Sequence, residues 1–222
     1  MSKVIAVVGS SQTGKTRFIE RLVPELKKRG RNVAVIKHCP HGFLFDVESK
    51  DSHRFFQAGA DGVAMAGPEM TAVVRRLSGS IDLRLIARTY FADADIVLVE
   101  GGKGLAGLPQ MELLRKGISE EPSSTSTEWS VLLADFAAKS DKPVLDVENI
   151  PAVADFLEKA PWDEMEDVIL EIDGSQVPIK DFVRAFMKNS ILGMIRALRG
   201  VKESPRHVRI SILQTKDRDE NP

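Results

Sequence analysis

The sequence predicts an α/β fold with three layers and a mostly parallel sheet, followed by a small α+β appendix. The first observation is a continuous apolar, β-branched run at residues 4–8, because such runs are typical of strands buried on both faces. The second is the helical spacing of apolar residues over 15–28, directly after a loop of small residues. The third is the repeated alternation of strand and helix patterns that follows, which favours a parallel sheet with crossover helices.

The first half of the chain contains the elements that surround this loop. The helix at 15–28 carries its apolar residues on one side and ends near Gly30, a residue type that favours a helix C-cap. Residues 39–50 look irregular, and a second helix begins at Asp51 or Ser52, either of which is a suitable N-cap. Further strands are predicted at 32–37, 62–66 and 70–77, the last two on either side of a Gly-Pro-Glu turn.

The second half continues the alternation. A helix is predicted at 81–90, and residues 93–102 form another buried strand that runs into glycines. A helix at 151–159 begins with a proline in its first turn, where the missing N–H does no harm. The remaining strands are predicted at 108–115, 131–134 and 144–147, with a Ser/Thr-rich loop over 116–128.

A Pro-led acidic stretch at residues 161–166 indicates a boundary between a domain of residues 1–160 and an extension of residues 161–222. The extension predicts a hairpin around Asp173-Gly174, an amphipathic helix and a closing strand at 206–213. A ββαβ unit of about sixty residues is marginal by itself unless it docks or pairs.

The charge balance and the cysteine count exclude several classes of function. The chain has 31 Lys and Arg against 32 Asp and Glu, so it lacks the positive excess that nucleic-acid binding uses. Its single cysteine, Cys39, allows no intrachain disulfide, which favours a reducing compartment. No apolar stretch reaches the length of a membrane span. We therefore expect a cytoplasmic protein that binds neither nucleic acid nor membrane.

Residues 9–16 fit the pattern G-x-x-x-x-G-K-[ST] between a predicted strand and a predicted helix, the context that a P-loop (Walker A) motif requires. Glycines let backbone N–H groups converge on an oxyanion, and the helix N-terminus adds a favourable partial charge. Lys15 would reach the β- and γ-phosphates, while the Thr16 hydroxyl would complete a Mg²⁺ shell. The sequence thus predicts a P-loop NTPase-type fold that binds a nucleoside triphosphate. The predicted nucleotide-binding residues here are Gly9, Ser10, Ser11, Gln12, Thr13, Gly14, Lys15 and Thr16.

A second acidic ligand for the metal is expected at the end of another buried strand. Glu100 follows four apolar residues in such a strand, although an acid at a strand end can also face water. Asp46, Lys50 and Asp51 follow the second strand and come close to the phosphates if the topology is as predicted. Each could instead be a solvated charge, and Asp51 could simply cap its helix.

Two further groups suggest ligand contacts. His38, Cys39 and His41 lie close together, but a tetrahedral metal site would need a distant fourth ligand, so we expect the two histidines to line a nucleotide or partner pocket. Asp141 could accept both the N1–H and N2–H₂ donors of guanine, a pair that adenine lacks. A plain turn residue before Pro143 is an equal alternative, so guanine is a preference only.

Several stretches together resemble the molybdopterin-guanine dinucleotide biosynthesis adaptor proteins, the MobB family. The matching stretches are GSSQTGKT, VIKHCPH, FDVESKDSHRFFQAGA, IVLVEGGK and SDKPVLDV, which span most of residues 3–160. The combination of I-K-H, K-D-S before R-x-x-x-A-G-A, and V-E-G-x-K is typical of a much narrower group of proteins than the P-loop motif alone.

The resemblance implies a P-loop fold of the signal-recognition and dethiobiotin-synthetase branch, a homodimer, and GTP binding with weak hydrolysis. It also implies a role beside the MobA nucleotidyltransferase, which joins GMP to molybdopterin. By position, Gly14, Lys15 and Thr16 become phosphate and metal contacts, Glu100 the acid of the second motif, and Asp51 a candidate Mg²⁺ ligand. The other family positions are Lys37, His38, His41, Asp46 and Lys50.

The chain departs from the family at Pro40, where many relatives have another histidine, and at Gly102, where relatives often have a bulky residue. Two other functions are compatible with the motifs: an ATP-dependent kinase or synthetase resembling dethiobiotin synthetase, and a metal-insertion chaperone. A kinase needs a lid with several arginines, whereas residues 103–128 contain one arginine, and a chaperone needs a His- or Cys-rich run that the sequence lacks. Both absences favour the adaptor, with a weak GTPase activity at most.

Overall fold

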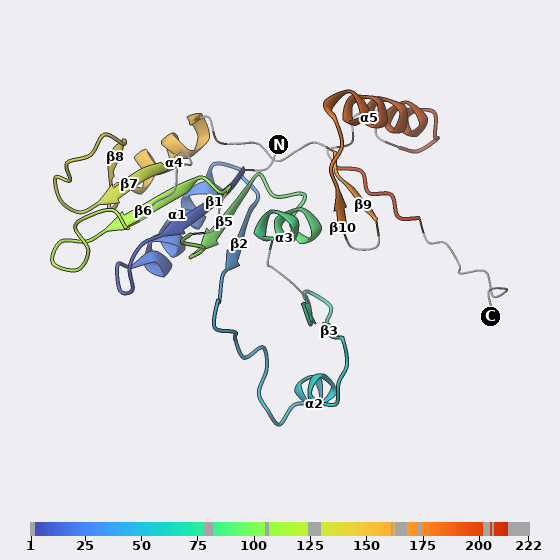
Figure 1. The fold of residues 1–222 in the computed structure, drawn as a ribbon, viewed down its shortest axis with the longest axis horizontal. Coiled ribbons are helices and arrows are strands. Elements are labelled where there is room, and N and C mark those ends of the chain that lie inside the picture. Colours follow the sequence, from blue (N-terminus) through green and yellow to red (C-terminus); the bar gives the residue numbers. More distant parts are fainter. Residues whose placement is uncertain are drawn as a thin grey trace. The chain divides into compact units, whose positions relative to one another are not determined.

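The computed structural model describes residues 3–77, 82–104, 107–123, 130–160, 162, 168–172, 175–201, 205 and 207–212 (Figure 1). The chain divides into two units. Lys3–Asp163 form the larger unit, and the smaller unit contains Glu164–Pro222. We describe each unit by itself.

The larger unit is built on a six-stranded sheet with the strand order β2-β5-β1-β6-β7-β8. Every neighbouring pair in this sheet is parallel, which confirms the predicted α/β fold. The strands are β1 (Lys3–Val8), β2 (Val33–Lys37), β5 (Ile96–Glu100), β6 (Gln110–Leu114), β7 (Ser130–Ala134) and β8 (Val144–Asp146). Because β1 lies inside the sheet, its residues from Val4 to Val8 are buried on both faces, as its unbroken apolar run predicts.

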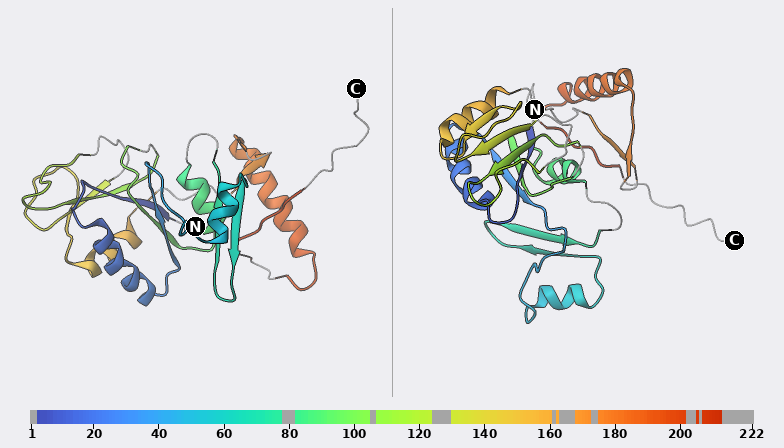
Figure 2. Two further views of the ribbon diagram at one scale, coloured as in Figure 1. Left: turned by 90° about the horizontal axis from the view of Figure 1, so that it is seen from below. Right: turned by 60° about the vertical axis from the view of Figure 1, so that its left-hand side comes forward.

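Two helices cover one face of this sheet (Figure 2). These helices, α1 (Lys15–Lys28) and α4 (Ile150–Lys159), contact each other. The side chains that they bury there include Phe18, Leu22, Leu26, Val153 and Leu157. On the other face, Phe136 and Ala138 of the loop after β7 pack against Leu114, Leu132 and Ala134. A third helix, α3 (Leu83–Tyr90), begins at Asp82, whose carboxylate accepts hydrogen bonds from two N–H groups of the first turn.

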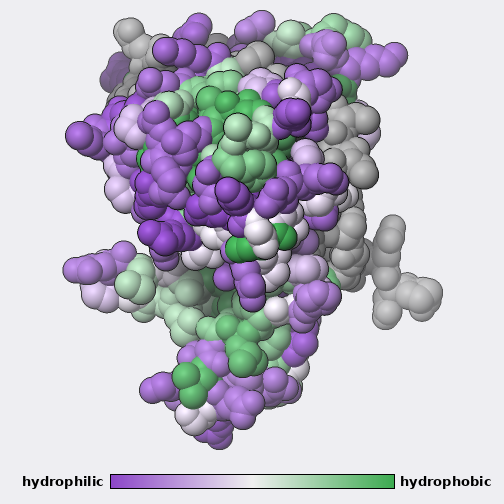
Figure 3. Space-filling model, turned by 90° about the vertical axis from the view of Figure 1, so that its left-hand side faces the viewer, coloured by the Kyte–Doolittle hydropathy of each residue, from purple (hydrophilic) through white to green (hydrophobic). Residues whose placement is uncertain are grey.

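A small hairpin lobe, made of α2 (Asp51–Gln57), β3 (Gly62–Ala66) and β4 (Thr71–Arg75), lies apart from this sheet in Figure 1. β3 and β4 form an antiparallel pair. No residue of these three elements is fully buried, and hydrophobic surface is visible on this lower part of the molecule (Figure 3). The predicted N-cap at Asp51 or Ser52 is wrong. The N-cap is Lys50, which provides no side-chain cap. The Ser52 hydroxyl does not cap the helix either, because it donates to Asp46.

The smaller unit contains a second antiparallel pair, β9 (Leu170–Ile172) and β10 (Ser175–Val177), followed by α5 (Asp181–Arg196). The turn predicted at Asp173-Gly174 lies outside the described residues. The closing strand is wrong for residues 207–212, which are described and form no strand. A strand exists only when a neighbour completes its hydrogen bonds, and the described residues pair no third strand with β9 and β10. Within the described part of the chain, no helix is long and apolar enough to cross a bilayer.

Candidate functional site

The P-loop joins the carboxyl end of β1 to the first residue of α1. Gly14 is the N-cap of α1, has a φ of 90° and provides no side-chain cap. The first N–H groups of α1 therefore have no capping side chain and are available to an oxyanion. Gly9 has a φ of 145°, and a Cβ atom there would lie 2.8 Å from the Leu113 carbonyl oxygen. Both glycines are thus required by the backbone itself, because a side chain would strain the turn or collide with β6.

The Lys15 side chain folds back over its own loop. Its ammonium group donates to the carbonyl oxygens of Gly9 at 2.9 Å and Ser10 at 2.7 Å. Partial burial lowers the pKa of Lys15, and the nearby Glu100 carboxylate opposes that shift. The Lys15 ammonium is therefore bound only by the neutral carbonyls of its own loop. A phosphate anion would attract it more strongly than these carbonyls do.

Thr16 and Glu100 meet at the carboxyl edge of the sheet. The Thr16 hydroxyl donates to the Glu100 carboxylate at 2.5 Å, and Lys37 Nζ lies 4.0 Å from the other carboxylate oxygen. The strand register places Glu100 opposite Lys37 of β2 on one side and opposite Val7 of β1 on the other. β1 leads directly into the P-loop, which carries Thr16 to the same edge. A hydroxyl and a carboxylate are oxygen ligands of the kind that Mg²⁺ prefers, so the pair fits the predicted metal site.

The other loop residues have different surroundings. Thr13 is buried, and its hydroxyl donates to the Ser10 carbonyl at 2.9 Å. The Ser10 hydroxyl is 3.1 Å from that of Ser119. Ser11 and Gln12 are exposed, and Gln12 has a φ of 65°, a conformation that few side chains adopt. The loop is therefore anchored through Ser10 and Thr13 and open at Ser11 and Gln12.

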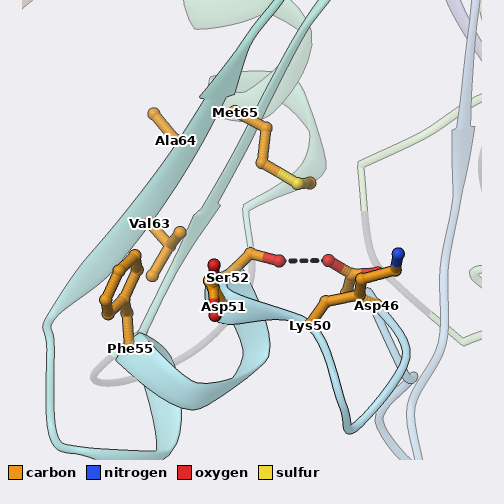
Figure 4. Close-up of a pocket in the computed structure, with 8 residues that line it drawn as sticks. All are labelled: Asp46, Lys50, Asp51, Ser52, Phe55, Val63, Ala64 and Met65. Atoms are coloured by element: carbon orange, nitrogen blue, oxygen red, sulfur yellow. Dashed lines mark hydrogen bonds between the residues drawn. The ribbon is translucent and has the colours of Figure 1, made fainter.

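The charged candidates that follow β2 lie in the loop just before the hairpin lobe and at the start of its helix α2. Asp46, Lys50 and Asp51 line an open cavity of about 390 Å³, together with Ser52, Phe55 and the β3 residues Val63, Ala64 and Met65 (Figure 4). The Ser52 hydroxyl bond lowers the pKa of Asp46. Asp51 is 3.4 Å from Arg54 and exposed. The structure thus brings Thr16 and Glu100 together and leaves Asp51 in this separate group.

The His-Cys-Pro-His stretch continues from β2. The His38 N–H donates to the Glu100 carbonyl at 3.0 Å, which holds His38 beside the Thr16–Glu100 pair. His41 is exposed. Among the residues that the structure describes, no group of three or more His, Cys, Asp or Glu side chains could hold a metal ion. His38 therefore remains a candidate for lining the nucleotide pocket, and His41 lies further along the loop.

Asp141 accepts a hydrogen bond from the Ser140 hydroxyl and makes no hydrogen bond to the P-loop among the described residues. The chain after β7 turns back over the sheet, where Phe136 and Ala138 pack. Pro143 then accepts a hydrogen bond from the Leu132 N–H in the middle of β7. Asp141 comes three residues before β8, whose first residue, Val144, is level with Val8 at the end of β1 through the pairings with Leu132 and Glu112. Its role in guanine recognition stays a prediction.

Sequence reasoning missed the role of Arg115, which directly follows β6. Its guanidinium donates to the Thr13 carbonyl at 3.1 Å, and to Asp135 and Glu148, each at 3.2 Å. The hydrogen bond from the Lys116 N–H is the main cause that lowers the pKa of Asp135, and the Arg115 guanidinium lowers this pKa further. The only signal in the sequence was a basic residue at a strand end, and the partner strand was unknown without the sheet order.

Comparisons with known proteins show which family this chain is similar to. Residues 4–135 match the family model of molybdopterin guanine dinucleotide synthesis protein B, MobB. The molybdopterin-guanine dinucleotide biosynthesis adapter protein of Haemophilus influenzae is 34% identical over 157 residues, covering 70% of this chain and 87% of the relative. A putative adapter protein of Methanocaldococcus jannaschii is 23% identical over 235 residues, covering 95% and 97%. A crystal structure of molybdopterin-guanine biosynthesis protein B superposes with a TM-score of 0.55 at 25% identity, over 70% of this chain and 96% of that one.

Proposed function

The chain belongs to the MobB family, and from this we propose that it is a GTP-binding adapter in the biosynthesis of molybdopterin guanine dinucleotide. The observation that carries the nucleotide part is the Thr16–Glu100 pair beside Lys15, at the uncapped start of α1. These groups supply, at one edge of the sheet, amides and a cation for phosphates and oxygen ligands for a metal.

When bound, Mg²⁺ would neutralise phosphate charge, and Thr16 and Glu100 would hold it. Lys15 would leave the Gly9 and Ser10 carbonyls and pair with the phosphates. Lys37 lies near Glu100 and would add positive charge to the same edge. The chain's contribution is to bind and orient the nucleotide.

We propose that hydrolysis is weak. Fast phosphoryl transfer uses a free arginine or a glutamine that orients water. Near the loop, Arg115 is already bonded to the Thr13 carbonyl and two carboxylates. The positive charge of Arg115 is therefore compensated within the protein, which supports a binding role more than an enzymatic one.

The proposed partner is a MobA-type molybdenum cofactor guanylyltransferase. We propose that the two proteins bind each other in the cytoplasm, a reducing compartment that is compatible with the free thiol of Cys39. We expect the immobilised full chain to retain the purified transferase, and GTP with Mg²⁺ to strengthen the retention. Surface plasmon resonance measures this, with an unrelated P-loop protein as the control surface. Equal binding to both surfaces, or none to this chain, would contradict the adapter role.

We propose a homodimer that forms through the hairpin lobe. An isolated two-stranded sheet is marginally stable in water, and α2, β3 and β4 bury no residue fully. β3 and β4 are the two strands of their sheet, so each leaves one edge unpaired among the described residues. A second copy of the lobe offers identical apolar residues, such as Val73, and identical open edges, which suit a two-fold interface.

Replacing Val73, which is 51% exposed on β4, with lysine is expected to convert a dimer into a monomer, because a charge would be placed in the apolar interface. Sedimentation velocity measures the change. The matched control is Ile118→Lys, since Ile118 is 54% exposed on the turn after β6 and should leave the dimer intact. A wild-type chain that sediments as a monomer at all concentrations would refute the proposal.

A further inference from the structure

We infer that Arg115 is the residue that positions the P-loop for phosphate binding, an inference that rests on the proposed nucleotide-binding function. Arg115 is the first residue after β6, the strand next to β1. It touches neither Lys15 nor the Thr16–Glu100 pair in any hydrogen bond of the described residues. Its action is therefore on the loop backbone and would reach the ligand only through it.

The contact with the loop is a charge-assisted hydrogen bond. Arg115 Nε donates to the Thr13 carbonyl oxygen at 3.1 Å, and Thr13 is fully buried. Hydrogen bonds from a charged donor are stronger than neutral ones, so this carbonyl has a firmly set direction. A Cβ atom on Gly14 would lie 3.4 Å from Arg115 Nη2, which places the guanidinium directly against the next residue of the loop.

The direction of that carbonyl sets the direction of an amide. In a trans peptide the C=O and N–H bonds point opposite ways, and the structure contains no cis peptide in its described residues. With the Thr13 carbonyl turned to Arg115, the Gly14 N–H of the same peptide points away from Arg115. Rotation of this peptide would turn the Gly14 N–H the other way, and the P-loop would lose one of the backbone N–H groups that can donate to a phosphate.

Arg115 is itself held from two other elements. Its Nη1 donates to Asp135, at the carboxyl end of β7, and to Glu148, just before α4. Glu148 also pairs with Arg21 of α1 at 2.5 Å. The Ser119 hydroxyl, from the same turn as Arg115, adds the contact with Ser10. The guanidinium thus connects the loop to parts of the protein that do not belong to the P-loop motif.

The chain contains a matched control. Arg29, at the C-cap of α1, also donates to a backbone carbonyl, that of Pro151. It donates as well to three carboxylates, those of Glu25, Asp155 and Glu158. Its side chain is 21% exposed, against 20% for Arg115. Arg29 is at the C-terminal end of α1, whereas Arg115 contacts the loop before the N-terminal end of that helix, so Arg29→Met removes a comparable network far from the loop.

The test compares the full-length wild-type chain with Arg115→Met and Arg29→Met. We expect Arg115→Met to raise the Kd for GTP with Mg²⁺ about tenfold or more, the effect of losing a hydrogen bond from a charged donor. Both variants should lower the melting temperature by similar amounts, but Arg29→Met should leave the Kd unchanged. In the nucleotide-free chains, amide hydrogen exchange in a peptide spanning residues 9–16 should become faster in Arg115→Met only.

The two readouts separate this inference from the proposed function. If the wild-type chain binds GTP and Arg115→Met binds it equally well, the inference is refuted and the nucleotide site stands. If the wild-type chain binds no GTP, the proposed function fails together with the inference. If Arg29→Met changes the Kd and the loop exchange as much as Arg115→Met, the effect is general destabilisation, and the positioning role is refuted.

Discussion

Lys15→Ala is expected to raise the Kd for GTP with Mg²⁺ by about 100-fold or more, which corresponds to about 2.7 kcal/mol. In the structure this ammonium reaches over the loop to the Gly9 and Ser10 carbonyls, so it lies directly beside the loop that would bind the phosphates. Removing it leaves the phosphate charge opposed mainly by backbone amides. Isothermal titration calorimetry measures the loss, with ATP titrated in parallel to determine the base preference.

The control is Lys27→Ala, because Lys27 lies in the last turn of the same helix and is exposed. It removes the same charge from the chain without touching the loop. We expect wild-type affinity from Lys27→Ala and nearly wild-type melting from both variants. An unchanged Kd in Lys15→Ala would refute the phosphate-binding role of the loop.

Gly9→Ala is expected to lower the free energy of unfolding by about 3 kcal/mol and to abolish GTP binding. The new Cβ would lie 2.8 Å from the Leu113 carbonyl oxygen and 3.0 Å from the Thr13 hydroxyl oxygen. The first of these neighbours is backbone of the adjacent strand and cannot turn aside, so the loop itself must move. Urea unfolding measures the stability, and calorimetry measures the binding.

Gly30→Ala separates the collision from the cost of an unusual φ. Gly30 has a φ of 77°, but a Cβ atom there would meet nothing within 4 Å. We expect that variant to lose about 1 kcal/mol, the cost of the left-handed conformation, and to keep its GTP affinity. If both variants bound GTP like the wild type, the narrow fit between the P-loop and β6 would have no role in ligand binding.

The elements of the larger unit were predictable because each is specified by neighbouring residues. The helix predicted at 15–28 is α1 (Lys15–Lys28), and the unbroken apolar runs became the buried strands β1 and β5. The same local rules failed at 207–212, where an apolar pattern pairs with no strand of the described residues. Alternation predicts what a segment can become, and hydrogen-bonding partners decide whether it does.

The site residues divide in the same way. Asp141 had a local pattern that suggested guanine recognition, and that role stays a prediction, because its side chain hydrogen-bonds only to the neighbouring Ser140 among the described residues. Arg115 had no local pattern at all, because its partner Thr13 is 102 residues away. The hairpin lobe had recognisable strands, yet only the burial of its residues indicates that it lacks a core of its own.

The sequence by itself determined the strand, loop and helix of residues 4–28 and the membership of the MobB family. Contiguous residues suffice there, because glycines and a helix start orient the amides of a single turn. The tertiary structure decided that Glu100 meets Thr16, 84 residues away, and that Arg115 supports the loop from β6. Such meetings depend on the order and register of strands, which long-range packing selects and no local stretch of residues contains.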